Sequence, residues 1–366
     1  MSLKKLNNEN LYYIGGIVRD EILGKKCFDV DVTYVGDAIE FCRNLDCDDC
    51  EILQINENFG TVRMRFGEEV IDVASTRDES YPQKGHLPVV QDIGCELKRD
   101  VLRRDFTINA IAKSVMTDEV VDYTGGLKDI EAKLLRVLHD NSFIDDPTRI
   151  VRALKFAVRF GFELEENTLK LQQEYLENVN YDMSFKRLKK ELIETFNLNI
   201  QSAYEKFFEY KIYRLLSKNE PSKFDYNIEE LVKKYPVENT WLVYMGGLDL
   251  DNLPLTRQEK KIVDDYKNLI SLKIEDDKFS IYTAFKDKEK ESILLYTIAT
   301  NSDLGLKYFE IKDVKLAIAG KDIIGFGIEP SPEFEKCFDY VLKQKLNNSN
   351  LSYDDEIALA KEFFRV

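Results

Sequence analysis

The sequence IGGIVRDEILGKKCFDVDV, residues Ile14–Val32, combines a glycine pair with two aspartates. Gly15 and Gly16 stand between a short apolar stretch that predicts a strand and an amphipathic stretch that predicts a helix. Glycine lets the backbone approach a ligand closely, and the start of a helix offers free N–H groups to a phosphate. Arg19, one helical turn further on, is expected to add a charged fork. A plain turn is the alternative interpretation of the glycine pair.

The two aspartates, Asp29 and Asp31, lie in a predicted strand, Phe28–Val35. Side chains two positions apart on a strand leave the same face, so these carboxylates are expected to repel each other unless a cation lies between them. Mg²⁺ is held by one or two carboxylates together with substrate phosphates. The alternative is an exposed edge strand with two surface acids. The apolar residues expected on the opposite face are Phe28, Val30 and Val32.

A third carboxylate, Asp72, lies in a stretch that predicts a hairpin, Thr61–Thr76, turning at Gly67-Glu68. It alternates with apolar neighbours, so it is expected to point away from the core face of a neighbouring strand. Two-metal phosphoryl transfer often uses such an additional acid. A surface aspartate is the alternative interpretation.

Composition excludes several classes of protein. The chain has 366 residues with a formal net charge of −15, which disfavours general nucleic-acid binding and requires local basic patches instead. Only two histidines are present, which argues against a serine–histidine or multi-histidine metal site. No apolar run is long enough to cross a bilayer and the N-terminus has no signal-peptide core, so we expect a cytoplasmic protein without a membrane partner.

Six cysteines without a secretory context predict reduced thiols. Cys42, Cys47 and Cys50 are spaced like part of a zinc site, with Cys27 or Cys95 as a conceivable fourth ligand. The aspartates between them are unfavourable for a zinc–thiolate knuckle, so the metal interpretation is the weaker one.

The pattern along the chain predicts an α+β protein. Short strands alternate with helices from residue 11 to about 138, and helical periodicity follows from about 139. The stretch Asp145–Phe162 predicts a helix with Asp146 at its N-cap, Pro147 at its first position and Gly161 at its end.

Three motifs together resemble a known family, the class II tRNA nucleotidyltransferases, which belong to the polymerase-β-like superfamily. The motifs are GGIVRDEILGKKCFDVDV (Gly15–Val32), RRDFTINAIA (Arg103–Ala112) and DDPTRIVRALKFAVRFGF (Asp145–Phe162). A weaker likeness to the family's tail covers Ala317–Phe334. The resemblance implies a nucleotidyltransferase head at 1–138, a helical neck that recognises the base at 139–200, and a helical body and tail that bind tRNA at 201–280 and 281–366.

The resemblance also implies roles for individual residues. Asp29 and Asp31 would hold Mg²⁺, and Asp72 stands where the family has a glutamate that helps to activate the attacking hydroxyl. The implied nucleotide-binding residues are Gly15, Gly16, Arg19, Arg104, Asp105, Asn109, Asp146, Arg149, Arg152 and Lys155. Lys155 departs from the family's usual arginine, which keeps the charge but loses the fork geometry.

The pair Asp146 and Arg149 suits cytosine and adenine. Both bases present an amino donor beside a ring-nitrogen acceptor, whereas guanine and uracil present a carbonyl acceptor beside an N–H donor. A carboxylate only accepts and a guanidinium only donates, so G and U would leave buried groups unpaired. A capping aspartate with a solvated arginine is the alternative interpretation.

The predicted activity is template-independent addition of CCA, from CTP and ATP, to the 3′ end of tRNA. The alternatives are an A-adding enzyme, then a poly(A) polymerase or CC-adding enzyme, and outside this class a catalytically silent RNA-binding relative. Arg77–Val90 fills the place of a loop that CC-only relatives lack, which argues against CC addition alone. No HD motif indicates a phosphohydrolase domain, and no protein partner is implied. The basic patches predicted to contact tRNA are Lys98–Arg104, the arginine face of 149–159, and a neck patch of Lys186, Arg187, Lys189 and Lys190.

Overall fold

The computed structural model describes residues 3–6, 8–27, 29–47 and 49–366. Its internal contacts divide the chain into two compact units, and each is described by itself. The first is Met1–Glu220 with Asn252–Pro254, and the second is Pro221–Asp251 with Leu255–Val366. The strands gather in the first unit and the rest of the chain is helical, which confirms the predicted α+β class. The finer division into head (1–138), neck (139–200), body and tail stays a prediction.

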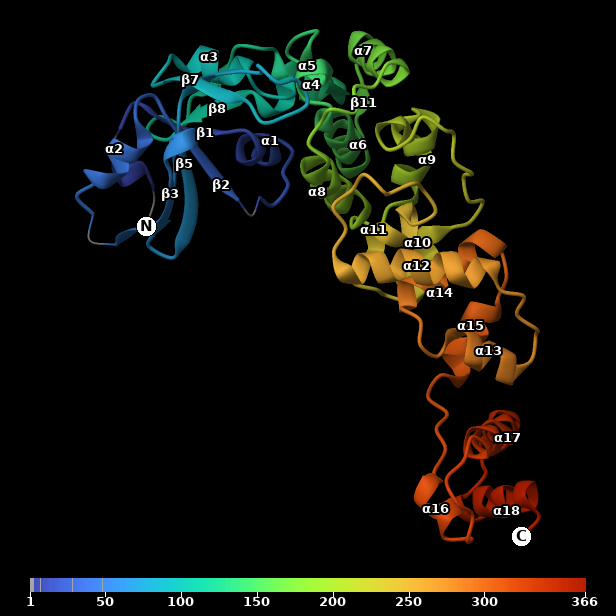
Figure 1. Ribbon diagram of the computed structural model, residues 1–366. Helices are drawn as coiled ribbons and strands as arrows, with labels where there is room; N and C mark the ends of the chain where they lie inside the picture. The colour runs from blue at the N-terminus through green and yellow to red at the C-terminus, as the bar shows by residue number, and fades with distance from the viewer. Residues whose placement is uncertain (1–2, 7, 28, 48) are drawn as a thin grey trace. The chain divides into compact units, whose positions relative to one another are not determined.

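A seven-stranded sheet in the described part of the head carries the predicted acids (Figure 1). Strand β2 pairs in parallel with β5, and the other neighbours are antiparallel. In order across the sheet the strands are β3 (Cys50–Asn56), β4 (Thr61–Phe66), β5 (Glu69–Ser75), β2 (Val30–Tyr34), β1 (Leu11–Ile14), β8 (Ile111–Ser114) and β9 (Val120–Asp122).

Alternation along these strands explains their placement. Burial alternates along β4 and β5, which form the predicted hairpin, and their inward residues pack with helix α2 (Ala38–Arg43) in one apolar core. The register sets Asp31 directly beside Asp72 on the neighbouring strand. Asp29 lies one residue before β2, so the prediction that both aspartates are strand residues is correct only for Asp31. The predicted core residue Phe28 lies outside the described residues.

Helices and a second hairpin complete the first unit. The hairpin joins β6 (Arg77–Ser80) to β7 (Val89–Ile93). The helices of the head are α1 (Gly16–Ile22), α2, α3 (Leu97–Leu102) and α4 (Gly126–Ala132), with short 3-10 turns η1 (Leu3–Leu6), η2 (Glu57–Phe59) and η3 (Thr107–Asn109). Beyond them lie α5 (Ser142–Asp145), α6 (Thr148–Phe160), α7 (Glu166–Glu177), α8 (Phe185–Phe196), α9 (Gln201–Glu209) and η4 (Ile212–Leu215).

Helix α6 spans Thr148–Phe160, so it begins one residue after the predicted first position and ends where predicted. Pro147 is the residue before the assigned helix, and Asp146 is extended and accepts a hydrogen bond from the backbone N–H of Thr148 at 3.2 Å. The N-cap is Pro147, one residue later than predicted, and the carboxylate of Asp146 supplies an acceptor to the first turn from the position before it. The helix ends at Gly161, as predicted. One departure from the helical pattern is the short parallel pair β10 (Leu134–Leu135) and β11 (Glu163–Leu164).

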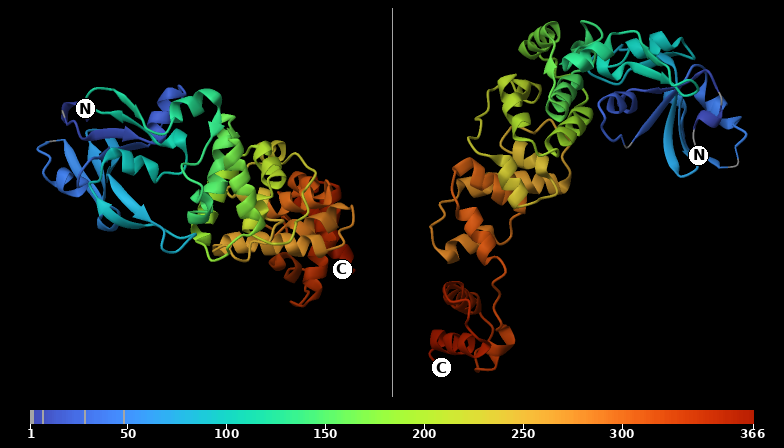
Figure 2. Two further views of the ribbon diagram at one scale, coloured as in Figure 1. Left: turned by 90° about the horizontal axis from the view of Figure 1, so that it is seen from above. Right: turned by 180° about the vertical axis from the view of Figure 1, so that it is seen from behind.

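The second unit consists of helices in its described structure (Figure 2). Separate apolar cores form around α12–α15 and around α16–α18. None of the helices in the described parts of the chain combines the length and apolar character needed to cross a membrane. The helices are α10 (Ile228–Lys234), α11 (Thr240–Met245), α12 (Arg257–Ser271), α13 (Lys278–Phe285), α14 (Lys290–Thr300), α15 (Leu304–Ile311), α16 (Gly320–Ile324), α17 (Glu333–Asn347) and α18 (Tyr353–Phe364).

The cysteines correct one prediction. Cys47 and Cys50 form a disulfide just before and at the start of β3, so the expectation of six reduced thiols is wrong for this pair. Their Cα atoms lie 5.4 Å apart, which is within disulfide range. The number of cysteines and the expected compartment do not determine this distance, which depends on the path of the chain. The free cysteines are Cys27, Cys42, Cys95 and Cys337.

Candidate active site

A cavity of about 310 Å³ in the first unit collects most of the predicted nucleotide-binding side chains. It is strongly charged, since six arginines and four acidic residues contribute to its wall. Hairpin β6–β7, the segment after α3, and helices α6 and α8 supply them. The lining residues are Phe59, Arg77, Glu79, Tyr81, Leu87, Pro88, Arg103, Arg104, Asp105, Asp146, Arg149, Arg152, Arg187 and Glu191.

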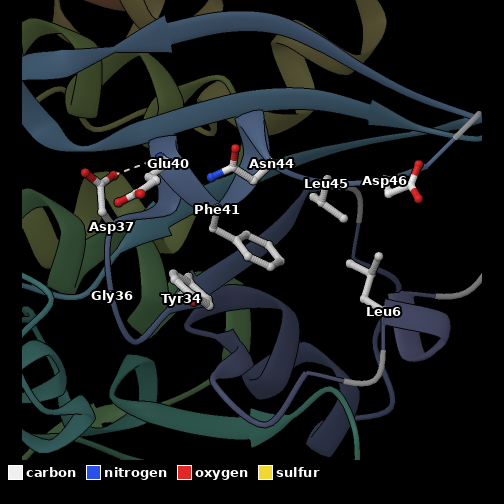
Figure 3. Close-up of a pocket in the computed structure, with 9 residues that line it drawn as sticks. All are labelled: Leu6, Tyr34, Gly36, Asp37, Glu40, Phe41, Asn44, Leu45 and Asp46. Carbon is white, nitrogen blue, oxygen red and sulfur yellow. Dashed lines mark hydrogen bonds between the residues drawn. The ribbon is translucent and has the colours of Figure 1, made fainter.

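A larger cavity of about 630 Å³ on the head lacks this chemistry (Figure 3). Its lining contains no predicted site residue, and Asp37 already caps α2 through the N–H groups of Ile39 and Glu40. Tyr34 and Phe41 fill one wall as a stacked pair with ring centroids 4.3 Å apart. Size alone would favour this cavity, but charge and the convergence of polar groups favour the smaller one.

The strand carboxylates form an acidic group on the head. The loss of hydration around Asp31 raises its pKa, the charges of Asp72 and Asp29 raise it further, and Arg104 opposes them. Asp72 makes a partly exposed ion pair with Arg63, with Nε and Oδ1 3.3 Å apart. Carboxylates that repel each other in this way are suited to a hard divalent cation.

The carboxylates fit a metal that is shared with a substrate. In the described ranges, no group of three or more His, Cys, Asp or Glu side chains is arranged to hold a metal by itself. Mg²⁺ needs only one or two protein carboxylates when phosphate oxygens complete its coordination. Asp29 and Asp31 are therefore the residues that would hold it.

The glycine turn lies against Arg104. Gly15 has φ of 74°, and a Cβ atom at this position would lie 3.1 Å from Nη1 of Arg104. Arg104 is only weakly satisfied, since Nη2 lies 3.3 Å from Asp100 and its buried Nε has no hydrogen-bond partner among the described atoms. An anion at the turn would satisfy such a donor, because a buried unpaired N–H is costly. This agrees with a triphosphate near Gly16 and Arg104.

Arg19 lies beneath the turn and is buried. It donates to Asp20 through Nε and Nη2 and to Asn109 through Nη1 at 2.5 Å. The rings of Phe156 and Phe160 flank its guanidinium at 5.2 and 4.6 Å. Burial lowers the pKa of Arg19, although the charge of Asp20 opposes this. In this arrangement Arg19 ties α1 to α6, and its contact with a nucleotide stays a prediction.

A network of charges joins the head to α6 and α8. Arg152 donates to Asp105 at 2.6 and 2.9 Å and to Glu191 at 3.2 Å. Burial alone would raise the pKa of Asp105, but Arg152 and the amide of Asn109 hold that pKa well below its usual range. Lys155 is buried and paired with Glu191 at 2.7 Å and Glu194 at 2.6 Å, so it reinforces this network instead of facing the cavity.

The predicted base-recognition pair is brought together in the cavity. Asp146 and Arg149 are each 4% exposed, and both side chains already have protein partners. Arg149 donates to the hydroxyl of Ser142 at 2.6 Å and to the hydroxyl of Tyr81 at 3.2 Å. Its third acceptor is the carbonyl oxygen of Arg103, also at 3.2 Å. These contacts fix the direction of the guanidinium.

Three comparisons with known proteins agree on one kind of enzyme. Residues 11–136 match the model of the Poly A polymerase head domain. The A-adding tRNA nucleotidyltransferase of Aquifex aeolicus is 44% identical over 163 residues, which cover 44% of this chain and 20% of that protein. A solved structure of a CCA-adding enzyme, apo form II, superposes with a TM-score of 0.78 at 25% identity, over 95% of this chain and 90% of that one. The chain resembles the class II tRNA nucleotidyltransferases over most of its length.

The match to curated members of this family covers only part of their length. The A-adding tRNA nucleotidyltransferase of Geobacter sulfurreducens is 29% identical over 398 aligned positions, which cover 96% of this chain but 44% of that protein. The chain thus spans less than half the length of the Aquifex and Geobacter nucleotidyltransferases. The family resemblance drawn from the three motifs is confirmed.

The cavity of about 310 Å³ also contains residues that the sequence motifs did not assign to it. Arg103 bridges Glu79 at 2.9 Å and the fully buried Asp100 at 2.7 Å. Burial alone would raise the pKa of Asp100, but Arg104 and Arg103 lower it. The sequence signal was present, since Arg103 lies in a stretch predicted to be a basic patch. Its acidic partner Glu79 comes from a different hairpin, so no spacing rule could connect them.

The predicted neck patch is not one continuous surface. Lys186 and Lys190 are exposed, but Arg187 turns into the cavity and pairs with Asp146. Lys189 is 9% exposed and donates to the carbonyl oxygen of Pro254 at 3.0 Å. The prediction that Lys189 contacts tRNA is therefore inconsistent with its burial. A tRNA contact by Lys186 and Lys190 stays a prediction.

The Asp105–Arg152 pair generates a stability prediction. A carboxylate with a depressed folded-state pKa stabilises the protein above its unfolded pKa, about 3.9, and this contribution is lost as the pH falls through the folded pKa. Asp105→Asn should therefore lower the free energy of unfolding at pH 7 by about 1–3 kcal/mol and flatten its decline below about pH 4. Urea unfolding at several pH values measures both effects.

The matched control is Glu51→Gln, which removes a carboxylate from the exposed ion pair with Arg65. Its effect should stay within about 0.5 kcal/mol at pH 7. Equal effects of the two substitutions would show that the buried network does not contribute as described.

Proposed function

We propose that this protein is a template-independent nucleotidyltransferase that adds C and A residues, from CTP and ATP, to complete the CCA end of tRNA. The observation that carries the proposal is the presence of Asp146, Arg149 and Arg104 in the lining of one cavity, with Arg104 close enough to Asp31 to lower the pKa of that carboxylate. The solved CCA-adding enzyme that resembles this chain supports it.

Base selection follows from the hydrogen-bonding capacity that this pair retains. Arg149 has five N–H donors, and three contacts to Ser142, Tyr81 and Arg103 leave donors for a ring nitrogen. Asp146 can accept from an exocyclic amino group. Cytosine and adenine satisfy both groups, whereas guanine and uracil would place an acceptor against the carboxylate and a donor against the guanidinium.

The reaction joins the 3′ oxygen of tRNA to the α-phosphorus of the nucleotide, and the bond to the departing pyrophosphate breaks. Arg104 and the turn at Gly15 and Gly16 would bind the triphosphate. Asp72, the register partner of Asp31 on the neighbouring strand, would accept the proton of the 3′ hydroxyl. Asp29 and Asp31 would hold a divalent metal such as Mg²⁺, whose charge would lower the pKa of the hydroxyl and stabilise the pyrophosphate.

The second candidate is addition of the terminal A alone. The Aquifex and Geobacter relatives carry this name, and the first of them shares 44% identity over 163 residues. The base-recognition pair accepts either C or A, so it does not separate the candidates. Hairpin β6–β7, which contributes Tyr81 to the cavity, argues against a CC-only enzyme. In both candidates we assign tRNA binding to the helices beyond residue 200.

Replacing a strand carboxylate should abolish transfer. Asp29→Ala or Asp31→Ala should lower kcat more than about a hundredfold, because the loss of one ligand raises the barrier by more than about 2.7 kcal/mol. The melting temperature should hold steady, since neither side chain belongs to the core. Incorporation of labelled ATP and CTP measures the loss, and activity within about tenfold of wild type would contradict the metal assignment.

Replacing the base-recognition pair should change selectivity more than rate. Asp146→Ala and Arg149→Ala each remove one of the two groups that distinguish C and A from G and U. We expect the ratio of correct to GTP and UTP incorporation to fall by about tenfold or more. Single-turnover incorporation of each nucleotide measures this ratio, and an unchanged ratio in both variants would refute protein-directed selection.

Product sequencing with three truncated tRNAs, ending before CCA, after the first C and after CC, tests the proposal as a whole. CCA completion on all three is the expected result. Extension of only the third would identify an A-adding enzyme. No extension of any of them by the folded protein would favour a catalytically silent RNA-binding relative.

A further inference from the structure

Arg187 lies on α8 and contacts Asp146, one member of the proposed base-recognition pair. Its Nη2 donates to Oδ2 of Asp146, and its Nη1 donates to the carbonyl oxygen of His86 at 3.4 Å. A charged contact between groups 41 residues apart is tertiary, and it joins the neck helix to the carboxylate that faces the base.

The contacts of Asp146 divide cleanly between its two oxygens. Oδ1 accepts from the N–H and the hydroxyl of Thr148, at 3.2 and 2.6 Å, and Oδ2 accepts from Arg187. A carboxylate offers about four acceptor positions, two on each oxygen. Within the described contacts, one position remains, and it is on Oδ2. One exocyclic amino group of a base requires one such position.

Helix α8 is anchored in the core beside Arg187. Leu188 and Leu192 bury the face next to Arg187 completely or nearly so, at 0% and 1% exposure. One turn after Arg187, Glu191 accepts from Arg152 and Lys155 of α6. The same helix face thus supplies a cation to Asp146 and an anion to Arg152. Both contacts hold α6 groups in a fixed direction.

We propose that Arg187 is a positioning residue for base selection: it holds the carboxylate of Asp146 so that a single Oδ2 acceptor position faces the amino group of C or A. This rests on the proposed role of Asp146. Arg187 acts through Asp146 and does not itself contact the base. Without it only the contacts of Oδ1 with Thr148 hold the carboxylate, so the direction of the Oδ2 acceptor that rejects G and U is less closely fixed.

A double-mutant cycle tests the inference with the full-length protein, tRNA ending in CC, and ATP or GTP as substrate. Arg187→Ala should lower the ATP-over-GTP ratio of kcat/KM by about tenfold, mainly through a higher KM for ATP. Arg187→Lys, which keeps the charge without the fork, should recover part of the ratio. Adding Arg187→Ala to Asp146→Ala should change the ratio by less than about twofold, because the two groups act as one unit.

The control is Lys170→Ala, which removes a positive charge from an exposed ion pair on α7 of the same unit and should leave every parameter unchanged. Full discrimination in Arg187→Ala, beside lost discrimination in Asp146→Ala, would overturn the inference and leave the proposed function intact. Full discrimination in Asp146→Ala itself would refute the proposed base recognition instead. Additive effects of the two substitutions on the ATP-over-GTP ratio in the double variant would also overturn the inference. If Arg187→Ala does not fold, an Arg187→Lys variant with no better ratio than Asp146→Ala would overturn it.

Discussion

The compensation of buried arginines by carboxylates is the interaction on which the site depends. Arg152 lies between Asp105 and Glu191, and Arg103 lies between Glu79 and Asp100. A guanidinium taken out of water is tolerable only when acceptors surround it, and removing one acceptor leaves a costly unpaired charge. Because each carboxylate comes from a different element, these pairs connect hairpin β6–β7, α3, α6 and α8.

This arrangement explains how an acidic chain could bind the triphosphate of the proposed reaction. The net charge of −15 describes the average over the molecule, while a triphosphate responds to the cavity wall, where six arginines gather. Most of these arginines are paired with neighbouring acids. The cavity wall therefore presents N–H donors in fixed orientations and little net positive charge. Arg104 differs, since its buried Nε lacks a partner within the described structure. It is therefore the arginine best prepared to receive an anion.

The same network connects the residues proposed to bind the triphosphate with those proposed to bind the base. The glycine turn and Arg104 belong to the head, whereas Asp146 and Arg149 belong to the neck. Asp105 links them, because it accepts from Asn109 within the head and from Arg152 on α6. The groups proposed to bind the phosphates and those proposed to bind the base are thus fixed relative to each other by one network of contacts. Selection of the base by protein groups requires such a fixed arrangement.

The sequence by itself determined the strands β1, β4 and β5 and, to within one residue, helix α6, because these depend on alternation and capping chemistry contained in short segments. It also named Asp146 and Arg149 as the pair proposed to recognise the base. It also placed Asp31 and Asp72 on neighbouring strands. It could not determine that Arg187 faces Asp146, that Lys155 and Lys189 are buried, or that Cys47 meets Cys50. Those outcomes depend on which faces of separate elements meet and on distances through space. A charged side chain in a sequence is equally suited to solvent or to a buried partner, and only the tertiary structure supplies the partner.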